Sequence, residues 1–354
     1  MSRDLQGVAQ QQFKNPGNNM AKIDSLFKMM KQQGASDLHI STGAPPLFRL
    51  HGEMEKLNYP PLSDQQARGL LYEILTKEQC AEFESNLDLD FAYALPEVAR
   101  FRGNLLETHR GIAAVFRIIP TKILTADQLG LPDGVRKLTK LKKGLVLVTG
   151  PTGSGKSTTL AAMIDLINKT RREHILTLED PLEFIHENQL SLLNQRQIGK
   201  HSQSFANALR AALREDPDVI LVGEMRDLET ISLAMTAAET GHLVFGTLHT
   251  NSAPKTIDRI IDAFPKDAQE QVRTMLGESL KGVICQQLLR TADGKGRAVA
   301  MEILICNAAV ANLIREGKTF QVPSIMQTAK GEGMQMMDQH ILCLLYTSDA
   351  ADEE

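Results

Sequence analysis

The chain has 354 residues, of which 42% are hydrophobic and 23% are charged, and its formal net charge is -4. This length allows two domains, and the composition is ordinary for a globular protein. The acidic balance gives no global positive field, so we expect no nucleic-acid partner. No run approaches the roughly 18 consecutive apolar residues of a membrane-spanning helix. The polar N-terminus has no apolar core and cannot act as a secretory signal.

The cysteines are few and far apart, and none forms a CxxC pair: Cys80, Cys285, Cys306 and Cys343. This spacing excludes a cysteine zinc site and gives no disulfide framework, as expected in a reducing cytosol. We therefore expect a cytoplasmic protein.

The first third of the chain predicts a small α+β domain over residues 20–118. Residues 1–19 are polar and are expected to be a disordered extension, with Met20 as a second candidate start. Apolar residues at helical spacing predict a helix that begins at residue 20 and ends at Gly34. Residues 36–57 and 101–119 read as short strands, and a helical stretch over 63–86 lies between them. Residues 119–143 are expected to be a linker ending in a basic run.

From Gly144 the chain alternates between short apolar runs and helix-forming stretches. The runs are residues 144–150, 174–180, 219–224 and 242–250. This alternation predicts an α/β domain over residues 144–341, with a mostly parallel sheet covered by helices on both faces.

A phosphate-binding loop follows the first of these strands. GPTGSGKST matches G-x-x-x-x-G-K-[ST] between a predicted strand and a predicted helix, which is the context that the motif requires. Backbone N–H groups of the loop would face a β-phosphate at the helix N-terminus, Lys156 would bridge the β- and γ-phosphates, and Ser157 would bind Mg²⁺. The predicted nucleotide-binding residues are Gly150, Pro151, Thr152, Gly153, Ser154, Gly155, Lys156, Ser157 and Thr158.

Acidic residues end two of the later strands. Glu179, Asp180 and Glu183 follow one strand, and Gly223-Glu224 follows another, with Gly223 in place of the usual Walker B aspartate. Ligands gather at the carboxyl ends of strands in open α/β sheets. We therefore predict that Glu224 polarises the attacking water, directly or through the Mg²⁺ shell, and that Glu183 assists.

His242 and His249 flank the strand LVFGTL. A lone histidine is usually a packed or surface residue, but two at one strand of a nucleotide domain are candidates for sensing the γ-phosphate. Metal ligation by these histidines alone is not expected, because no cysteine or acid stands at ligand spacing.

Four segments resemble, in order and spacing, the signature boxes of secretion-type ATPases. They are GPTGSGKST, ILTLEDPLE, ALREDPDVILVGEMRD and AAETGHLVFGTLHTNSA, which correspond to Walker A, Asp box, Walker B and His box. The chain is similar to the pilus-retraction (twitching-motility, PilT) ATPase family from about Met20 to Ile341. The extension and type II secretion ATPases carry a tetracysteine zinc insertion and a larger N-terminal region, which this chain lacks.

The resemblance implies a PAS-like N-terminal domain, a RecA-like ATPase domain and a homo-hexameric ring that uses ATP and Mg²⁺. Lys156, Glu183, Glu224, His242 and His249 match the family's functional positions. The family also implies that N-terminal arginines reach the phosphates, and the candidates are Arg102, Arg110 and Arg117. Their positive charge would neutralise the transferring phosphoryl group.

By resemblance, the expected function is a cytoplasmic motor at the inner-membrane face, which acts on a pilus platform protein to retract type IV pili. Ala311 stands where the family's AIRNLIRE element has arginine. An accessory paralogue, or a regulatory subunit of a pilus or type II secretion system working with a partner ATPase, is therefore the alternative. A nucleic-acid pump is disfavoured by the acidic balance and by the absence of aromatic–basic clusters.

The C-terminal residues depart from the family after Ile341. The run CLLYTSDAADE, residues 343–353, reads like a translated sequencing-library adapter. We expect residues 342–354 to be a non-native tail that packs poorly, and a genuine short acidic tail is the alternative.

Overall fold

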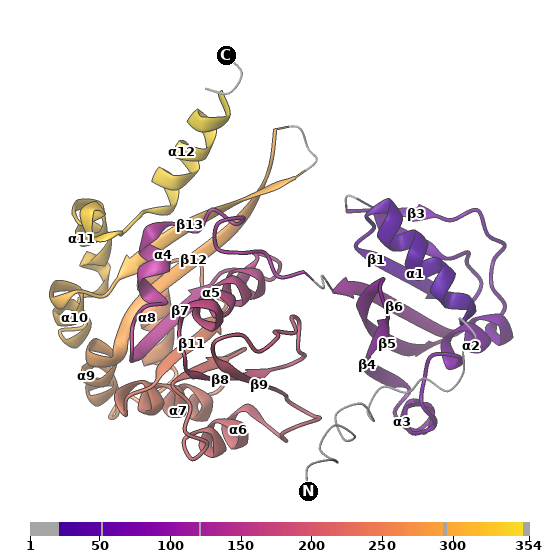
Figure 1. Ribbon diagram of the computed structural model, residues 1–354, viewed down its shortest axis with the longest axis horizontal. Coiled ribbons are helices and arrows are strands. Elements are labelled where there is room, and N and C mark those ends of the chain that lie inside the picture. The colour runs from indigo at the N-terminus through magenta and orange to yellow at the C-terminus, as the bar shows by residue number, and fades with distance from the viewer. Residues whose placement is uncertain (1–20, 51, 120–121, 293–295, 350–354) are drawn as a thin grey trace, which may run out of the picture. The chain divides into compact units, whose positions relative to one another are not determined.

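The computed structural model describes residues 21–50, 52–119, 122–292 and 296–349. The chain divides into two compact units, residues 1–121 and 122–354 (Figure 1). The predicted extension over residues 1–19 lies outside the described residues, as do the last five residues of the tail. Among the described residues, no helix combines the length and apolar character needed to cross a bilayer.

The first unit contains a six-stranded antiparallel sheet in the order β3-β2-β1-β6-β5-β4. Its strands are β1 (Asp37–Ser41), β2 (Leu47–Leu50), β3 (Glu53–Lys56), β4 (Asp88–Leu95), β5 (Ala99–Thr108) and β6 (Gly111–Ile119). Helix α1 (Lys22–Gln33) contributes buried side chains to the core on one face, where Phe27 stacks on Phe101 with ring centroids 4.1 Å apart. The predicted α+β character of this segment is confirmed, and its likeness to a PAS domain stays a prediction.

The helical character predicted over residues 63–86 is confirmed, and the structure divides this stretch into two helices. They are α2 (Asp64–Tyr72) and α3 (Lys77–Asn86). The second begins with its own capping box, in which Thr76 Oγ1 accepts from the Gln79 N–H at 3.2 Å and Gln79 Oε1 accepts from the Thr76 N–H at 3.0 Å. Such a box satisfies the free N–H groups of a new helix and so starts one here.

The second unit contains a seven-stranded sheet in the order β13-β12-β7-β11-β10-β8-β9. All neighbouring strands are parallel except the β12–β13 pair. The strands are β7 (Gly144–Thr149), β8 (His174–Glu179), β9 (Leu192–Gln197), β10 (Val219–Val222), β11 (Leu243–Leu248), β12 (Leu280–Arg290) and β13 (Arg297–Ile305). The four predicted apolar strands and the α/β class are confirmed.

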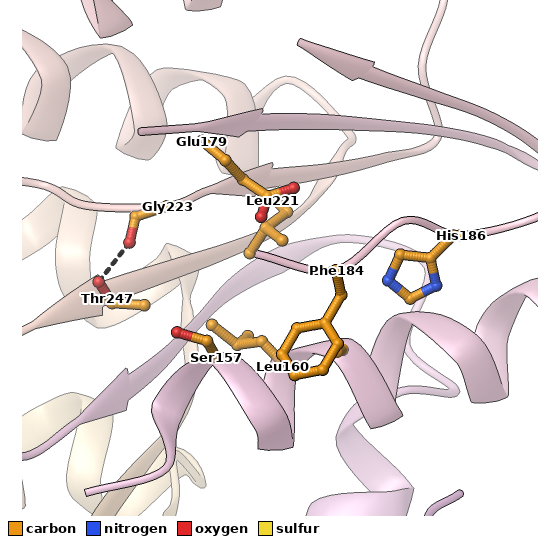
Figure 2. Close-up of a pocket in the computed structure, with 9 residues that line it drawn as sticks. Ser157, Leu160, Glu179, Phe184, His186, Leu221, Gly223 and Thr247 are labelled. Atoms are coloured by element: carbon orange, nitrogen blue, oxygen red, sulfur yellow. Dashed lines mark hydrogen bonds between the residues drawn. The ribbon is translucent and has the colours of Figure 1, made fainter. Parts of the chain in front are cut away.

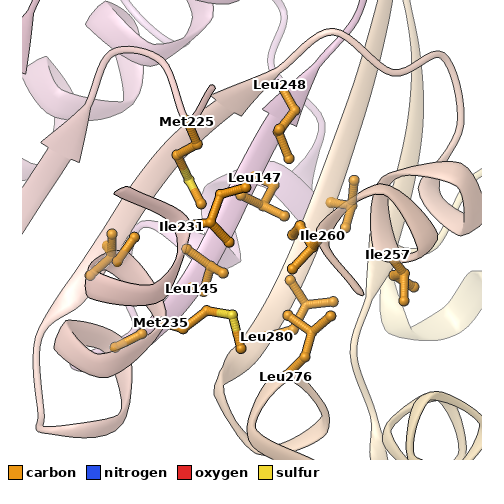
Figure 3. Close-up of a cluster of buried hydrophobic side chains, with 14 of the residues drawn as sticks. Leu145, Leu147, Met225, Ile231, Met235, Leu248, Ile257, Ile260, Leu276 and Leu280 are labelled. Atoms are coloured by element: carbon orange, nitrogen blue, oxygen red, sulfur yellow. The ribbon is translucent and has the colours of Figure 1, made fainter. Parts of the chain in front are cut away.

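Helices cover both faces of this sheet, because each buried strand presents alternate side chains to opposite sides. Val146 and Val148 of β7 join the core beneath α4 (Asp133–Leu138) and α5 (Lys156–Thr170). Leu145 and Leu147 join the opposite core (Figure 3). That core is built with α6 (Phe205–Ala212), α7 (Leu228–Glu239), α8 (Ala253–Asp262), α9 (Gln269–Ser279), α10 (Ala308–Arg315) and α11 (Val322–Thr328).

Two segments at the margins of this unit bear on the predicted boundaries. Ala126, Leu131 and the α4 residue Val135, all within the segment expected to be a linker, are buried in the core of this unit. Helix α12 (Met337–Asp349) runs through the start of the expected tail, where Leu342 and Tyr346 are exposed. The domain boundaries and the origin of the tail remain predictions.

Candidate active site

The phosphate-binding loop joins the end of β7 to the start of α5, as the sequence predicts. Gly150 has φ 143°, and a Cβ atom there would lie 2.4 Å from the carbonyl oxygen of Gln286. Only glycine fits this approach of two backbones. The loop therefore turns tightly under the N-terminus of α5, where N–H groups and the helix dipole favour an anion.

Lys156 is the first residue of α5 and its ammonium lies against the loop. Nζ donates to the carbonyl oxygens of Gly150 at 2.8 Å and Pro151 at 3.1 Å. Burial lowers the pKa of Lys156, while the nearby carboxylates of Glu224 and Glu183 act in the opposite direction. Because both carboxylates act on the Lys156 ammonium, the three predicted residues Lys156, Glu183 and Glu224 belong to a single site.

The sheet register explains why these residues meet. Thr149 of β7 lies beside Leu248 of β11, and Val222 of β10 lies beside Leu178 of β8. The carboxyl ends of these strands therefore share one edge. Glu183, Glu224 and His249 all follow strand ends at that edge, next to the phosphate-binding loop.

Glu224 is held by donors from two segments. Its Oε1 lies 2.5 Å from Arg226 Nε and 3.1 Å from His249 Nε2. The hydrogen bond from Arg226 is the main reason why the pKa of Glu224 lies below its usual value, and His249 adds to the effect. Glu224 therefore presents an ionised carboxylate at neutral pH. The sequence prediction missed Arg226, although a basic residue two positions after the acid was visible in GEMRD.

Gly223 occupies the position of the usual Walker B aspartate and is packed against β8. A Cβ atom there would lie 3.0 Å from the carbonyl oxygen of Leu178 and 3.2 Å from Glu179 Cα. A side chain at this position would make tight contacts with the β8 backbone, which would have to shift by a few tenths of an ångström. Glu224 is therefore the acid that β10 delivers to the edge, as predicted.

A cavity of about 40 Å³ lies behind the loop (Figure 2). Ser157 lines one wall, and Glu179, His186 and Thr247 line others. Glu179 Oε1 accepts from Thr177 Oγ1 at 2.7 Å, and burial raises the pKa of this carboxyl group. Glu179, the last residue of β8, faces this cavity, whereas the side chain of Glu183 in the following loop is exposed. The sequence prediction chose Glu183 and left Glu179 without a role.

His186 is a second residue that the sequence prediction missed. Its ring lies in the wall of the cavity (Figure 2), and burial lowers its pKa to about 4. The backbone N–H of His186 donates to Gln195 Oε1 at 2.8 Å, which fixes the segment. No pattern around FIH marked this position, because its burial depends on how the loop after β8 folds back.

The protein side chains near Ser157 can supply only part of the ligand set of a Mg²⁺ ion, and phosphate oxygens would have to supply other ligands. Within the described part of the chain, no group of three or more His, Cys, Asp or Glu side chains could hold a metal. Mg²⁺ prefers oxygen ligands and usually takes one or two from protein, with the remainder from phosphates and water. The Ser157 hydroxyl and the Glu224 carboxylate are groups of that kind.

The structure does not bring His242 to the loop of its own chain. His242 precedes β11, and its carbonyl oxygen accepts from Gly144 at the start of β7, with N···O 3.0 Å. Its Nδ1 lies 2.9 Å from the carbonyl oxygen of Ala237. The two histidines thus lie at opposite ends of strand β11, and only His249 joins the Glu224 site.

The three predicted arginines lie in the first unit, on β5, on β6 and in the turn between them. Arg117 Nε donates to the buried Asp37 Oδ1 at 2.8 Å. Arg102 Nε lies 3.8 Å from Asp90 Oδ1, with both side chains largely exposed. Arg102 and Arg117 are directly opposite each other in the β5–β6 pair. Each of these two guanidinium groups therefore has a carboxylate beside it on the sheet surface.

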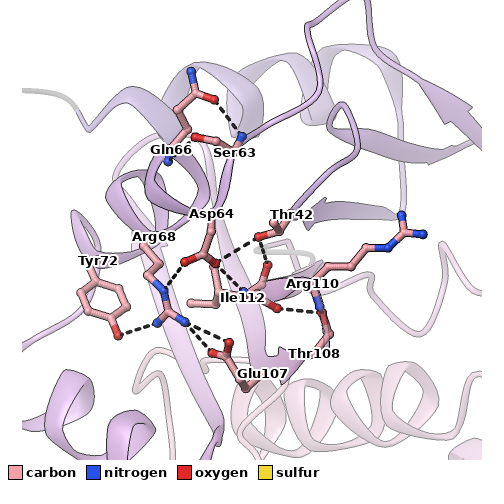
Figure 4. Close-up of polar contacts among 11 residues, drawn as sticks. Thr42, Ser63, Asp64, Gln66, Arg68, Tyr72, Glu107, Thr108, Arg110 and Ile112 are labelled. Carbon is pink, nitrogen blue, oxygen red and sulfur yellow. Dashed lines mark hydrogen bonds and ion pairs between the residues drawn. The ribbon is translucent and has the colours of Figure 1, made fainter.

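Arg110 differs from the other two in its surroundings. A neighbouring ion network joins Arg68 to Asp64 and Glu107, with Nε···Oδ2 and Nη2···Oε2 both 2.8 Å (Figure 4). Arg110 extends away from this network. Within the described residues it makes no ion pair with a carboxylate. Its guanidinium group therefore remains available to an anion.

The fold and the site together define a secretion-type P-loop protein. The model of the family "Type II/IV secretion system protein" matches residues 15–341, and the chain belongs to this family. It is 53% identical over 322 residues to the type IV pilus retractation ATPase PilT of Pseudomonas aeruginosa, covering 91% of this chain and 92% of that protein. It is 40% identical over 326 residues to the type IV pilus ATPase PilU of the same organism, covering 92% and 85%.

A solved structure gives the same relationship. The crystal structure of the pilus retraction motor PilT with bound ADP superposes with a TM-score of 0.86 at 48% sequence identity. The superposition covers 93% of this chain and 94% of that chain.

Proposed function

We propose that this protein is an ATPase motor that retracts type IV pili, with Mg-ATP as its fuel. The observation that carries the proposal is the convergence of Lys156, Glu224 and His249 at one edge of the sheet. A phosphate bound in the loop would meet the lysine, and a water beside it would meet an ionised glutamate oriented by a histidine. This arrangement suits attack of water on a γ-phosphate.

The individual roles follow from position and charge. The loop N–H groups and Lys156 bind the phosphates, and Ser157 with Glu224 supplies oxygen ligands for Mg²⁺. Glu224 polarises the attacking water, and His249 orients Glu224. Glu183 adds negative charge near the lysine, as its influence on the Lys156 pKa supports. His242, at the far edge of its own sheet, is proposed to act only between copies of the chain.

The working assembly that we propose is a homo-hexamer with nucleotide between neighbours. Arg102, Arg110 and Arg117 of one copy would then neutralise phosphate charge in the next. We place the ring in the cytoplasm, against an inner-membrane pilus platform protein. The similarity to the ADP-bound retraction motor supports the use of nucleotide.

Two measurements test this function. The purified protein should hydrolyse ATP with Mg²⁺, and Lys156→Ala should abolish turnover by removing the cation that holds the phosphates. Deletion in the host should leave many pili and no twitching. A deletion strain without pili would contradict retraction and favour an extension motor.

A second candidate is an accessory retraction ATPase. Ala311 on α10 stands where the retraction family has arginine, and 40% identity to PilU shows that this second class of pilus ATPase is also a relative. An accessory protein should need a partner motor for twitching. Retraction that persists in the deletion strain, driven by a second ATPase, would favour this candidate.

A further inference from the structure

A buried glutamate outside the phosphate site links the starts of two helices. Glu302 lies on β13 opposite Cys285 of β12 and is 6% exposed. Its Oε1 accepts from the backbone N–H of Ala253, the first residue of α8, at 2.7 Å. The backbone N–H of Met337, the first residue of α12, also faces this carboxyl group and acts to lower its pKa. A buried carboxylate with two backbone donors is costly to disturb, because either donor would lose its partner.

The first of these helix starts controls the loop that carries His249. Only residues 249–252 separate β11 from α8. Thr256 of α8 bonds this loop twice, since its Oγ1 lies 2.6 Å from Thr250 Oγ1 and donates to the Ser252 carbonyl oxygen at 2.8 Å. The loop is therefore fixed to α8, and α8 is fixed to β13 through Glu302. His249, at the other end of the loop, meets Glu224 at 3.1 Å.

The second helix start is bound to the same stretch of β13. The Met301 N–H donates to His340 Nδ1 of α12 at 2.9 Å, next to the Glu302 contact with Met337. A displacement of α12 would therefore act on the carboxylate that also holds α8.

We infer that Glu302 is a positioning residue for ATP hydrolysis, which holds His249 against Glu224 by fixing the start of α8 and which places α12 in contact with that arrangement. This inference rests on the proposed role of His249. It assigns Glu302 no contact with nucleotide.

The test is a double-mutant cycle on kcat with Glu302→Gln, His249→Ala and the pair. Gln keeps the size of the side chain but sets an NH₂ group against one of the two N–H donors. We expect Glu302→Gln to lower kcat about tenfold, as the loss of one charge-assisted hydrogen bond implies, with KM for ATP within about twofold of wild type. In the His249→Ala background the same change should lower kcat no further. Glu278→Gln, an exposed glutamate of the same unit, is the matched control.

Several outcomes overturn the inference. It fails if Glu302→Gln leaves kcat unchanged, or if its effects and those of His249→Ala multiply. If His249→Ala keeps full turnover, both this inference and the role of His249 fail, while ATPase activity of the wild type stands. If Glu302→Gln does not fold by circular dichroism, Glu302→Asp replaces it in the same cycle, since Asp keeps the charge and shortens the reach.

Discussion

At the scale of single residues, Glu224 is the acid to which we assign the attacking water in the proposed mechanism. Arg226 and His249 both contact its Oε1, and the resulting fall in its pKa keeps it charged. A charged carboxylate can orient water and bind Mg²⁺ water, whereas a protonated one is a poor acceptor. Two donors on a single carboxylate oxygen therefore stabilise the ionised form of Glu224.

Glu224→Gln should lower kcat by about 10²-fold or more and should leave ATP binding nearly unchanged. The amide preserves shape but removes the charge that orients water. Turnover is followed by phosphate release, and binding by titration with a fluorescent ATP analogue. Undiminished turnover would remove Glu224 from the catalytic role, provided that Glu278→Gln behaves as wild type.

His186 predicts an acid-dependent loss of stability. Its pKa is about 4 in the folded protein and near 6.5 when exposed. Between these values the unfolded chain binds a proton that the folded chain refuses, so lowering the pH favours unfolding. From pH 7 to pH 5 the wild type should lose about 2 kcal/mol more than His186→Gln. Urea unfolding at the two pH values measures this difference, and an equal loss in both proteins would show that His186 is solvated.

Motif spacing located Lys156, Ser157 and Glu224, because a strand, a tight loop and a helix leave those side chains little freedom. The location of His242 could also have been derived. His242 precedes strand β11 and His249 follows it, seven positions later. The two side chains must therefore lie at opposite ends of that strand. The contact between Arg226 and Glu224 could not have been derived from the sequence, because a long exposed side chain has many rotamers and no periodic signal.

At the scale of secondary-structure elements, four parallel strands of the second sheet were predicted, whereas β4, β9, β12 and β13 were not. β7, β8, β10 and β11 are covered on both faces and read as apolar runs. β9 carries the sequence LLNQRQ and stands at the edge of the sheet, where polar side chains are tolerated. Its pattern resembles a loop, and only pairing with β8 makes it a strand.

The N-cap residue of α10 provides a test of how much a single capping side chain contributes to stability. Asn307 Oδ1 accepts from the Val310 N–H at 3.0 Å, and its Nδ2 donates to Glu332. Asn307→Ala should destabilise the second unit by about 1 kcal/mol and lower its Tm by about 2–4 °C. Asn312→Ala, an exposed position within the same helix, should change stability by less than about 0.5 kcal/mol. Calorimetry compares the two, and equal shifts would mean that the cap contributes nothing.

At the scale of the whole molecule, the phosphate-binding loop and the candidate arginines belong to different compact units. Each unit has its own hydrophobic core. The sequence indicated both sets of residues but could not show which of the three arginines is free to bind phosphate. The structure separates them by partner, with Arg117 bound to Asp37, Arg102 weakly paired and Arg110 unpaired among the described carboxylates.

If a neighbour completes each nucleotide site, specific activity should rise with protein concentration as rings form. Mixing inactive Lys156→Ala with an inactive Arg102→Ala, Arg110→Ala or Arg117→Ala protein should restore part of the turnover. Some interfaces in a mixed ring regain an intact loop and an intact arginine. Steady-state ATPase assays across mixing ratios measure the rescue. Absence of rescue with all three variants would place the arginines within one subunit, or outside catalysis.

The close packing of Gly223 also limits how this site can evolve. A glycine codon becomes an acidic codon, aspartate or glutamate, by one base change. The backbone of β8 packs tightly against this position, because a Cβ atom would lie 3.0 Å from the Leu178 carbonyl oxygen. An acid at this position therefore requires a small accompanying shift of the β8 backbone. Strand packing, rather than the genetic code, therefore disfavours a second acid at the end of β10.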